Sequence, residues 1–130
     1  MLAVCDDPLG IEDRRIPDSS FFSSGVYSSR FVATNARLNR PASYGGSDTD
    51  GAWSPATLDA NQYIGVNLGV VKRVSGIVMQ GRENRDAWVT KFKVGYKNDT
   101  GGEWMAVQDA KQKDDMVRLF QFLSVSFIFL

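Results

Sequence analysis

The stretch 88–104 constrains the fold of this chain more than any other segment. Its first half alternates three apolar positions with three basic ones: Phe92, Val94 and Tyr96 against Lys91, Lys93 and Lys97. Because successive side chains of a strand point to opposite faces, this alternation predicts a strand with one buried and one solvated face. Residues 98–102 are of the types that tolerate positive φ in a tight reversal, and an apolar run begins at Trp104. The stretch therefore predicts a β-hairpin.

The rest of the chain repeats this pattern of short apolar runs separated by turn residues, which is typical of an all-β sandwich or barrel. Alternation at 63–68 predicts a second strand with one buried face, and 74–79 predicts a strand covered on both faces. Phe120 to Leu130 is rich in Phe, Val and Ile and is predicted as a strand, with a short helix over 114–122 as the alternative. We expect a core formed by Trp53, Tyr63, Ile64, Val66, Leu68, Val78, Phe92 and Val94.

Composition excludes several classes of function. A chain of 130 residues with 43% hydrophobic and 23% charged residues is an ordinary globular domain. Its net charge of zero creates no global field toward nucleic acid, although Arg30, Arg37 and Arg40 form a stretch without acids. One cysteine and no histidine exclude a Cys/His zinc cluster and a histidine-based catalytic site. No carboxylate pair stands out from the turn acids, so we expect a binding protein and not an enzyme.

A series of short motifs points to a known family. The motifs are 5–10, 16–20, 35–38, 51–55 (Gly-Ala-Trp-Ser-Pro), 63–69 (Tyr-Ile-Gly-Val-Asn-Leu-Gly), 74–81 and 88–90 (Trp-Val-Thr). In this order and spacing they resemble the discoidin family, also called the coagulation factor V/VIII type C domain. One departure is Asn67, which stands where the family's strand ends in Asp-Leu-Gly.

The resemblance implies a distorted jelly-roll β-sandwich of the galactose-binding type. It covers residues 5–109, which we expect to form an incomplete discoidin-like domain, followed by a divergent apolar tail at 110–130 without the family's closing strands. The family's opening cysteine pairs with one near the domain's end, and the chain offers Cys5 no such partner. We therefore expect marginal stability, with aggregation through Phe120 to Leu130.

Three loops resemble the spikes that project from one end of the family's fold: 23–34 (first spike), 39–51 (second spike) and 81–87 (third spike). Aromatic and arginine side chains suit a membrane surface, where rings enter the acyl boundary and guanidinium groups pair with phosphate. The expected ligand-binding residues are Tyr27, Arg30, Phe31, Arg40, Tyr44 and Arg82. The alternative is that Tyr27 and Phe31 fold inward as structural residues. The resemblance implies an extracellular or cell-surface adhesion module that docks on anionic phospholipid or on another cell-surface or matrix ligand.

Two other functions remain open. Relatives that capture peptide carboxylates suggest a cleft between the spikes formed by Tyr27, Phe31, Ser54 and Asp59, which would hold a protein tail or a glycan. The absence of histidine disfavours galactose. The second alternative is a truncated fragment without independent function.

No cofactor is expected. Asp48 and Asp50 before Gly51 resemble a calcium-type loop only weakly, because turns use Asp for its own hydrogen bonding. The three tryptophans at 53, 88 and 104 are expected to be structural and not sugar-stacking.

Overall fold

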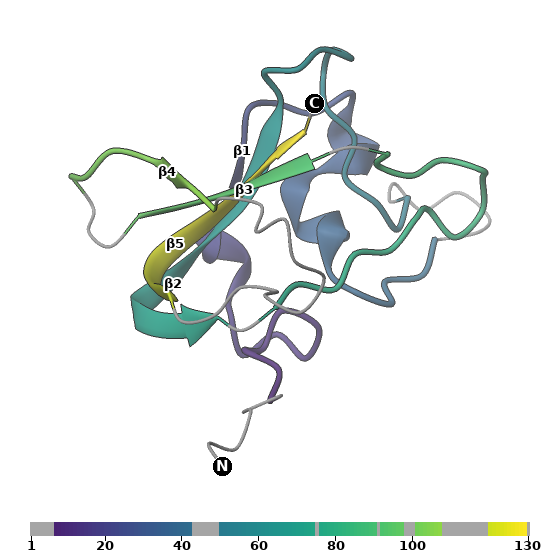
Figure 1. Cartoon of the computed structure of the whole chain (residues 1–130). Helices are drawn as coiled ribbons and strands as arrows, with labels where there is room; N and C mark the ends of the chain where they lie inside the picture. The colour runs from purple at the N-terminus through teal and green to yellow at the C-terminus, as the bar shows by residue number, and fades with distance from the viewer. Residues whose placement is uncertain are drawn as a thin grey trace.

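A computed structural model describes residues 7–42, 50–74, 76–90, 92–97 and 101–107, and the backbone of 120–129. Its main element is a five-stranded antiparallel sheet in the order β1-β2-β5-β3-β4 (Figure 1). The strands are β1 (Phe21–Ser23), β2 (Tyr63–Val74), β3 (Phe92–Lys97), β4 (Met105–Ala106) and β5 (Phe120–Phe129). Three 3₁₀-helices, η1 (Asp18–Ser20), η2 (Ser29–Phe31) and η3 (Ala33–Ala36), complete the described elements. The predicted all-β class is confirmed.

The strand β5 lies in the centre of the sheet, between β2 and β3. The strand predicted for this segment is thereby confirmed over Phe120–Phe129. In the middle of the sheet Ser126 pairs with Gly65 on one side and with Gly95 on the other. The division of the chain at residue 109 stays a prediction about domain boundaries.

The buried face of β2 carries the predicted alternation. Ile64 and Val66 are buried and Leu68 is half-buried, while Tyr63 and Asn67 lie on the opposite, exposed side. Val74 forms a further apolar cluster with Leu9, Leu68, Ile77, Val94, Tyr96 and Val107. The burial of Ile64 and Val66 confirms the core prediction for these two residues, and the partial burial of Leu68, Val94 and Trp53 confirms it in part.

Three predicted core residues are exposed. Tyr63 shares the outer face of β2 with Gly65, because residues two apart point the same way. Val78 is 76% exposed in a segment to which the structure assigns no strand, so no partner strand is assigned to cover it. Phe92 begins β3 and is about half exposed. Trp88 is 66% exposed and is therefore not a core residue, contrary to the structural role expected for it as part of the 88–90 motif.

The outer face of the sheet carries an aromatic cluster. The Phe22 ring lies 6.4 Å from the Tyr63 ring and 6.1 Å from the Trp104 ring, and Lys97 Nζ lies 4.9 Å from the centre of Trp104. The row of residues that pair across all five strands from Phe22 is Gly65, Ser126, Gly95 and Ala106. Because Gly65 and Gly95 have no side chains, the rings from both edges of the sheet have room to approach.

The segment before β1 is held by Arg37. This side chain is only 4% exposed, donates to the carbonyl oxygens of Ile11 and Ile16 and to the Asp18 carboxylate, and stacks 4.6 Å above the Phe21 ring. Arg37 is therefore a structural anchor, although the stretch of sequence around it contains no acid. In the described part of the chain, no helix has the length and apolarity needed to cross a membrane.

Candidate functional site

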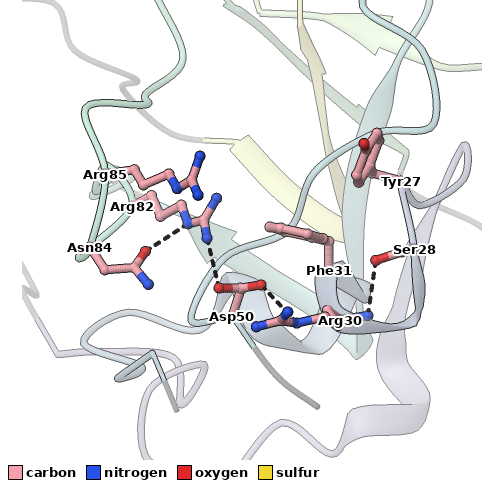
Figure 2. Close-up of a pocket in the computed structure, with 8 residues that line it drawn as sticks. All are labelled: Tyr27, Ser28, Arg30, Phe31, Asp50, Arg82, Asn84 and Arg85. Atoms are coloured by element: carbon pink, nitrogen blue, oxygen red, sulfur yellow. Dashed lines mark hydrogen bonds and ion pairs between the residues drawn. The ribbon is translucent and has the colours of Figure 1, made fainter. Parts of the chain in front are cut away.

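The first and third spikes enclose a pocket of about 470 Å³ (Figure 2). Its lining comes from both spikes and from the end of the second: Tyr27, Ser28, Arg30, Phe31, Asp50, Arg82, Asn84 and Arg85. Four of the expected site residues, Tyr27, Arg30, Phe31 and Arg82, are thus brought together. Tyr44 and Asp48 lie outside the described residues.

The first spike folds around a short helical turn. Ser28 precedes η2, its carbonyl accepts from Phe31 N at 3.0 Å, and its hydroxyl accepts from Arg30 N at 3.4 Å. The buried Asn35 side chain donates to the Arg30 carbonyl at 2.8 Å from the next turn. Two backbone hydrogen bonds, Tyr27 N to Ser54 O at 2.9 Å and Ser54 N to Phe31 O at 3.4 Å, attach both ends of the turn to one residue.

The aromatic wall of the pocket consists of Tyr27 and Phe31. Their rings meet edge to face, with centroids 5.8 Å apart and planes at 79°. Phe31 is half-buried, whereas Tyr27 is 70% exposed at the rim. The structural alternative therefore holds for Phe31 in part, while Tyr27 is free to touch a ligand.

Asp50 joins the arginines of two spikes at the base of the pocket. It is only 4% exposed, and its two carboxylate oxygens accept separately: Oδ1 from Arg82 Nη2 at 2.7 Å and Oδ2 from Arg30 Nε at 3.1 Å. Its backbone N–H donates to the Arg30 carbonyl at 3.0 Å. Both oxygens are already paired with guanidinium groups, which argues against Asp50 as a calcium ligand. Among the described residues, no group of three or more Cys, His, Asp or Glu could hold a metal ion.

The residue after Asp50 has to be glycine because the backbone of residues 40–42 passes close to its Cα. A Cβ on Gly51 would collide with the Arg40 carbonyl oxygen and would lie 2.8 Å from the Pro41 carbonyl carbon. Real Cβ atoms essentially never come within 3.0 Å of another heavy atom, so only glycine fits here. The close approach of the two backbone segments at Gly51 in turn holds the neighbouring Asp50 in place.

The third spike places two arginines on the pocket. Arg82 Nε donates to Asn84 Oδ1 at 2.8 Å, and its guanidinium lies 5.0 Å from the centre of the Phe31 ring. A hydrogen bond from Arg82 N to Ala87 O at 2.9 Å closes the loop. Arg85 is exposed and lines the same pocket, and within the described residues its side chain has no ion-pair partner.

The electrostatic character of the pocket follows from these groups. Three guanidinium groups face one carboxylate, so positive charge is in excess although the whole chain is neutral. The low exposure of the Arg82 and Asp50 side chains strengthens this field locally relative to bulk water. The arrangement can hold an anion, and its one lining carboxylate is already paired with two arginines.

The remaining expected residues lie elsewhere. Ser54 holds the first spike through its backbone but does not line the pocket. Asp59 organises its own turn: it accepts from Gln62, Asn61 N and Thr57, and these hydrogen bonds, that of Gln62 above all, lower the pKa of its carboxyl. Arg40 is half-buried and also lies off the pocket.

Sequence reasoning missed Ser28, Asn84 and Arg85 as lining residues, and it considered Asp50 only as a weak candidate for a metal ligand. The only signal for Asn84 and Arg85 was the charged composition of 82–86, which local ion pairing explained equally well. Nothing in the sequence predicted that Asp50 would contact Arg82, because the two residues lie 32 positions apart in the chain.

A family model described as "F5/8 type C domain" matches residues 18–124. The chain belongs to this family. It is 31% identical over 118 residues to the mouse protein "EGF-like repeat and discoidin I-like domain-containing protein 3", covering 89% of this chain and 24% of the relative. It is 36% identical over 108 residues to mouse retinoschisin, covering 78% of this chain and 45% of the relative.

The solved structure of recombinant discoidin II of Dictyostelium discoideum matches with a TM-score of 0.70 and 25% identity, covering 84% of this chain and 48% of that chain. The chain thus spans less than half the length of these relatives. The discoidin resemblance is confirmed, and with it the β-sandwich class and the assignment to a family of non-catalytic binding domains. The family match ends at 124, within β5.

Proposed function

We propose that this discoidin-type domain is an extracellular adhesion module that docks on anionic phospholipid, with a headgroup phosphate in the pocket between the first and third spikes. The observation that carries the proposal is the pocket itself: three arginines and one carboxylate beside an exposed aromatic rim. Similarity to a protein named for discoidin I-like domains and to retinoschisin supports a binding role.

The mechanism combines insertion of Tyr27 with charge attraction by the arginines. Burying an aromatic tip contributes roughly 1.5–3 kcal/mol by area, against about 1 kcal/mol for each arginine near an anionic surface. Tyr27 has this surface to offer because it is 70% exposed. Loss of the ring should therefore weaken binding more than loss of one arginine, and added salt should weaken only the charge contribution.

Liposome co-sedimentation tests the proposal. The domain should bind vesicles that contain an anionic lipid, phosphatidate or phosphatidylglycerol, and ignore pure phosphatidylcholine vesicles, and Tyr27→Ala and Arg85→Ala should each reduce binding. Matched controls are Leu58→Ala, which removes a 95% exposed apolar side chain away from the pocket, and Arg73→Ala, which removes an exposed arginine of β2. A folded domain that ignores anionic vesicles would refute lipid docking.

The second candidate is capture of a peptide tail or glycan in the same pocket. The edge-to-face pair of Tyr27 and Phe31 favours it, because such a wall suits a flat or apolar ligand group. Ser54 and Asp59 give it no support, since neither lines the pocket. Peptide and glycan arrays, repeated with Tyr27→Ala, distinguish this candidate from lipid docking.

A further inference from the structure

Arg82 has one edge of its guanidinium committed and one edge available. Nε donates to Asn84 and Nη2 to Asp50, so the edge formed by these two nitrogens is in use. Figure 2 shows the other terminal nitrogen directed away from Asp50, on the side where Arg85 is drawn. A planar guanidinium held in this way can bind an oxyanion with two parallel hydrogen bonds without losing much side-chain freedom. Stacking on Phe31 at 5.0 Å keeps the plane in place.

Arg85 supplies a second cation to the same space. It lines the pocket with Arg82, and no acid among the described residues forms an ion pair with it. After Asp50 offsets one of the three guanidinium charges, two positive charges remain in excess at the pocket. A ligand with one negative charge would leave this excess only half compensated.

Asp50 also determines what the pocket rejects. Both of its oxygens accept from arginines, and the residue is almost fully buried. It is the only carboxylate among the lining residues, so a ligand ammonium or guanidinium group would find no free acceptor carboxylate there. A cationic ligand group would instead face Arg30, Arg82 and Arg85, which repel it.

We infer that the pocket selects a doubly charged tetrahedral oxyanion, the phosphomonoester group of a lipid, over singly charged phosphodiester headgroups and over headgroups that carry an ammonium. A phosphomonoester carries about 1.5–2 negative charges at neutral pH and three acceptor oxygens, which match two guanidinium edges. This inference rests on the proposed lipid docking and names the headgroup class for that site.

The test compares vesicles of equal zeta potential that contain phosphatidate, phosphatidylglycerol or phosphatidylserine in phosphatidylcholine. We expect half-maximal binding at about tenfold less phosphatidate than phosphatidylglycerol, since one extra charge-assisted contact corresponds to roughly that factor. Arg85→Ala should bring the ratio close to one, whereas Arg73→Ala should leave it unchanged. Circular dichroism confirms that each variant is folded.

A soluble arm uses glycerol 3-phosphate, which should bind the domain as followed by NMR or by competition with phosphatidate vesicles. The diester glycerophosphoglycerol should bind at least about tenfold more weakly. Equal binding to phosphatidate and phosphatidylglycerol, a preference for phosphatidylserine, or an equal loss in Arg73→Ala would overturn the inference and leave lipid docking intact. Binding of glycerol 3-phosphate that Arg85→Ala abolishes, without binding to any vesicle, would overturn lipid docking and retain the phosphomonoester as a free ligand.

Discussion

Asp50 Oδ1 lies 2.7 Å from Arg82 Nη2, and this contact joins the end of the second spike to the start of the third. The same carboxylate holds Arg30 of the first spike at 3.1 Å. One buried acid therefore links all three loops that line the pocket.

Replacing Asp50 by Asn should destabilise the domain by about 1–3 kcal/mol, because a partly buried arginine then loses its counter-charge. Arg82 is largely buried, while Arg30 is half exposed and can turn to water. The free energy of unfolding from urea titration measures the effect. Asp13→Asn, which removes an exposed ion pair with Arg15, is the matched control and should leave the urea midpoint unchanged. Equal midpoints for both variants would contradict the assigned role of Asp50.

Gly51→Ala should cost about 1–3 kcal/mol of stability, because the added methyl group would collide with the backbone of Arg40 and Pro41. Gly76→Ala is the control: a methyl group added there would have no heavy atom within 4 Å, and the φ of Gly76 lies outside the left-handed region. Thermal denaturation of the two variants should separate them clearly. If Gly51→Ala were as stable as Gly76→Ala, the backbone at Arg40 and Pro41 would have to move aside at little cost to accommodate the methyl group.

The Asp18–Arg37 contact should make stability depend on acid. The side-chain hydrogen bond from Arg37 lowers the pKa of the Asp18 carboxyl below its ordinary value of 3.8. A lowered folded-state pKa means that the contact contributes fully above the ordinary value and that this contribution is lost as the pH falls below it. Urea midpoints measured from pH 6 down to pH 2.5 should therefore fall less steeply at the acid end for Asp18→Asn than for the native chain. If the urea midpoints of the two proteins fell equally steeply with pH, Asp18 would not contribute to the loss of stability in acid.

Trp53→Phe should lower the free energy of unfolding by about 1 kcal/mol, because the indole N–H donates to the Gly25 carbonyl at 3.0 Å. Trp88→Phe makes the same chemical change at an exposed side chain and should have no measurable effect. Acrylamide should quench Trp88 fluorescence far more than that of Trp53. If the two substitutions cost the same, the exposure of Trp88 in the structure would be contradicted.

Periodicity within single segments predicted the sheet well. The alternation at Ile64 and Val66 and the strand at Phe92–Lys97 follow from the spacing of apolar residues, and the strand at Phe120–Phe129 follows from its richness in Phe, Val and Ile. Tyr63, Val78 and Phe92 failed as core residues because burial depends on what covers a face, and alternation alone does not say which face is covered.

The candidate site was predictable only in part. Aromatic and arginine side chains in loops indicated Tyr27, Arg30, Phe31 and Arg82 as binding residues, and the structure gathers these four. The pairing of Asp50 with two distant arginines and the position of Arg85 depend on how three loops meet in space. Contacts between loops leave no periodic trace in a sequence, so these roles became visible only with the fold.

The central position of β5 has a consequence for how the chain acquires its structure. β2 and β3 do not pair with each other; each pairs with β5, which follows both in the sequence. During synthesis the two earlier strands therefore leave the ribosome with open edges and wait for a partner that is translated after them. Such non-local pairing makes folding slow and exposes unpaired strands to other molecules. The domain is accordingly expected to depend on chaperones until Phe120–Phe129 has emerged and the sheet forms around it.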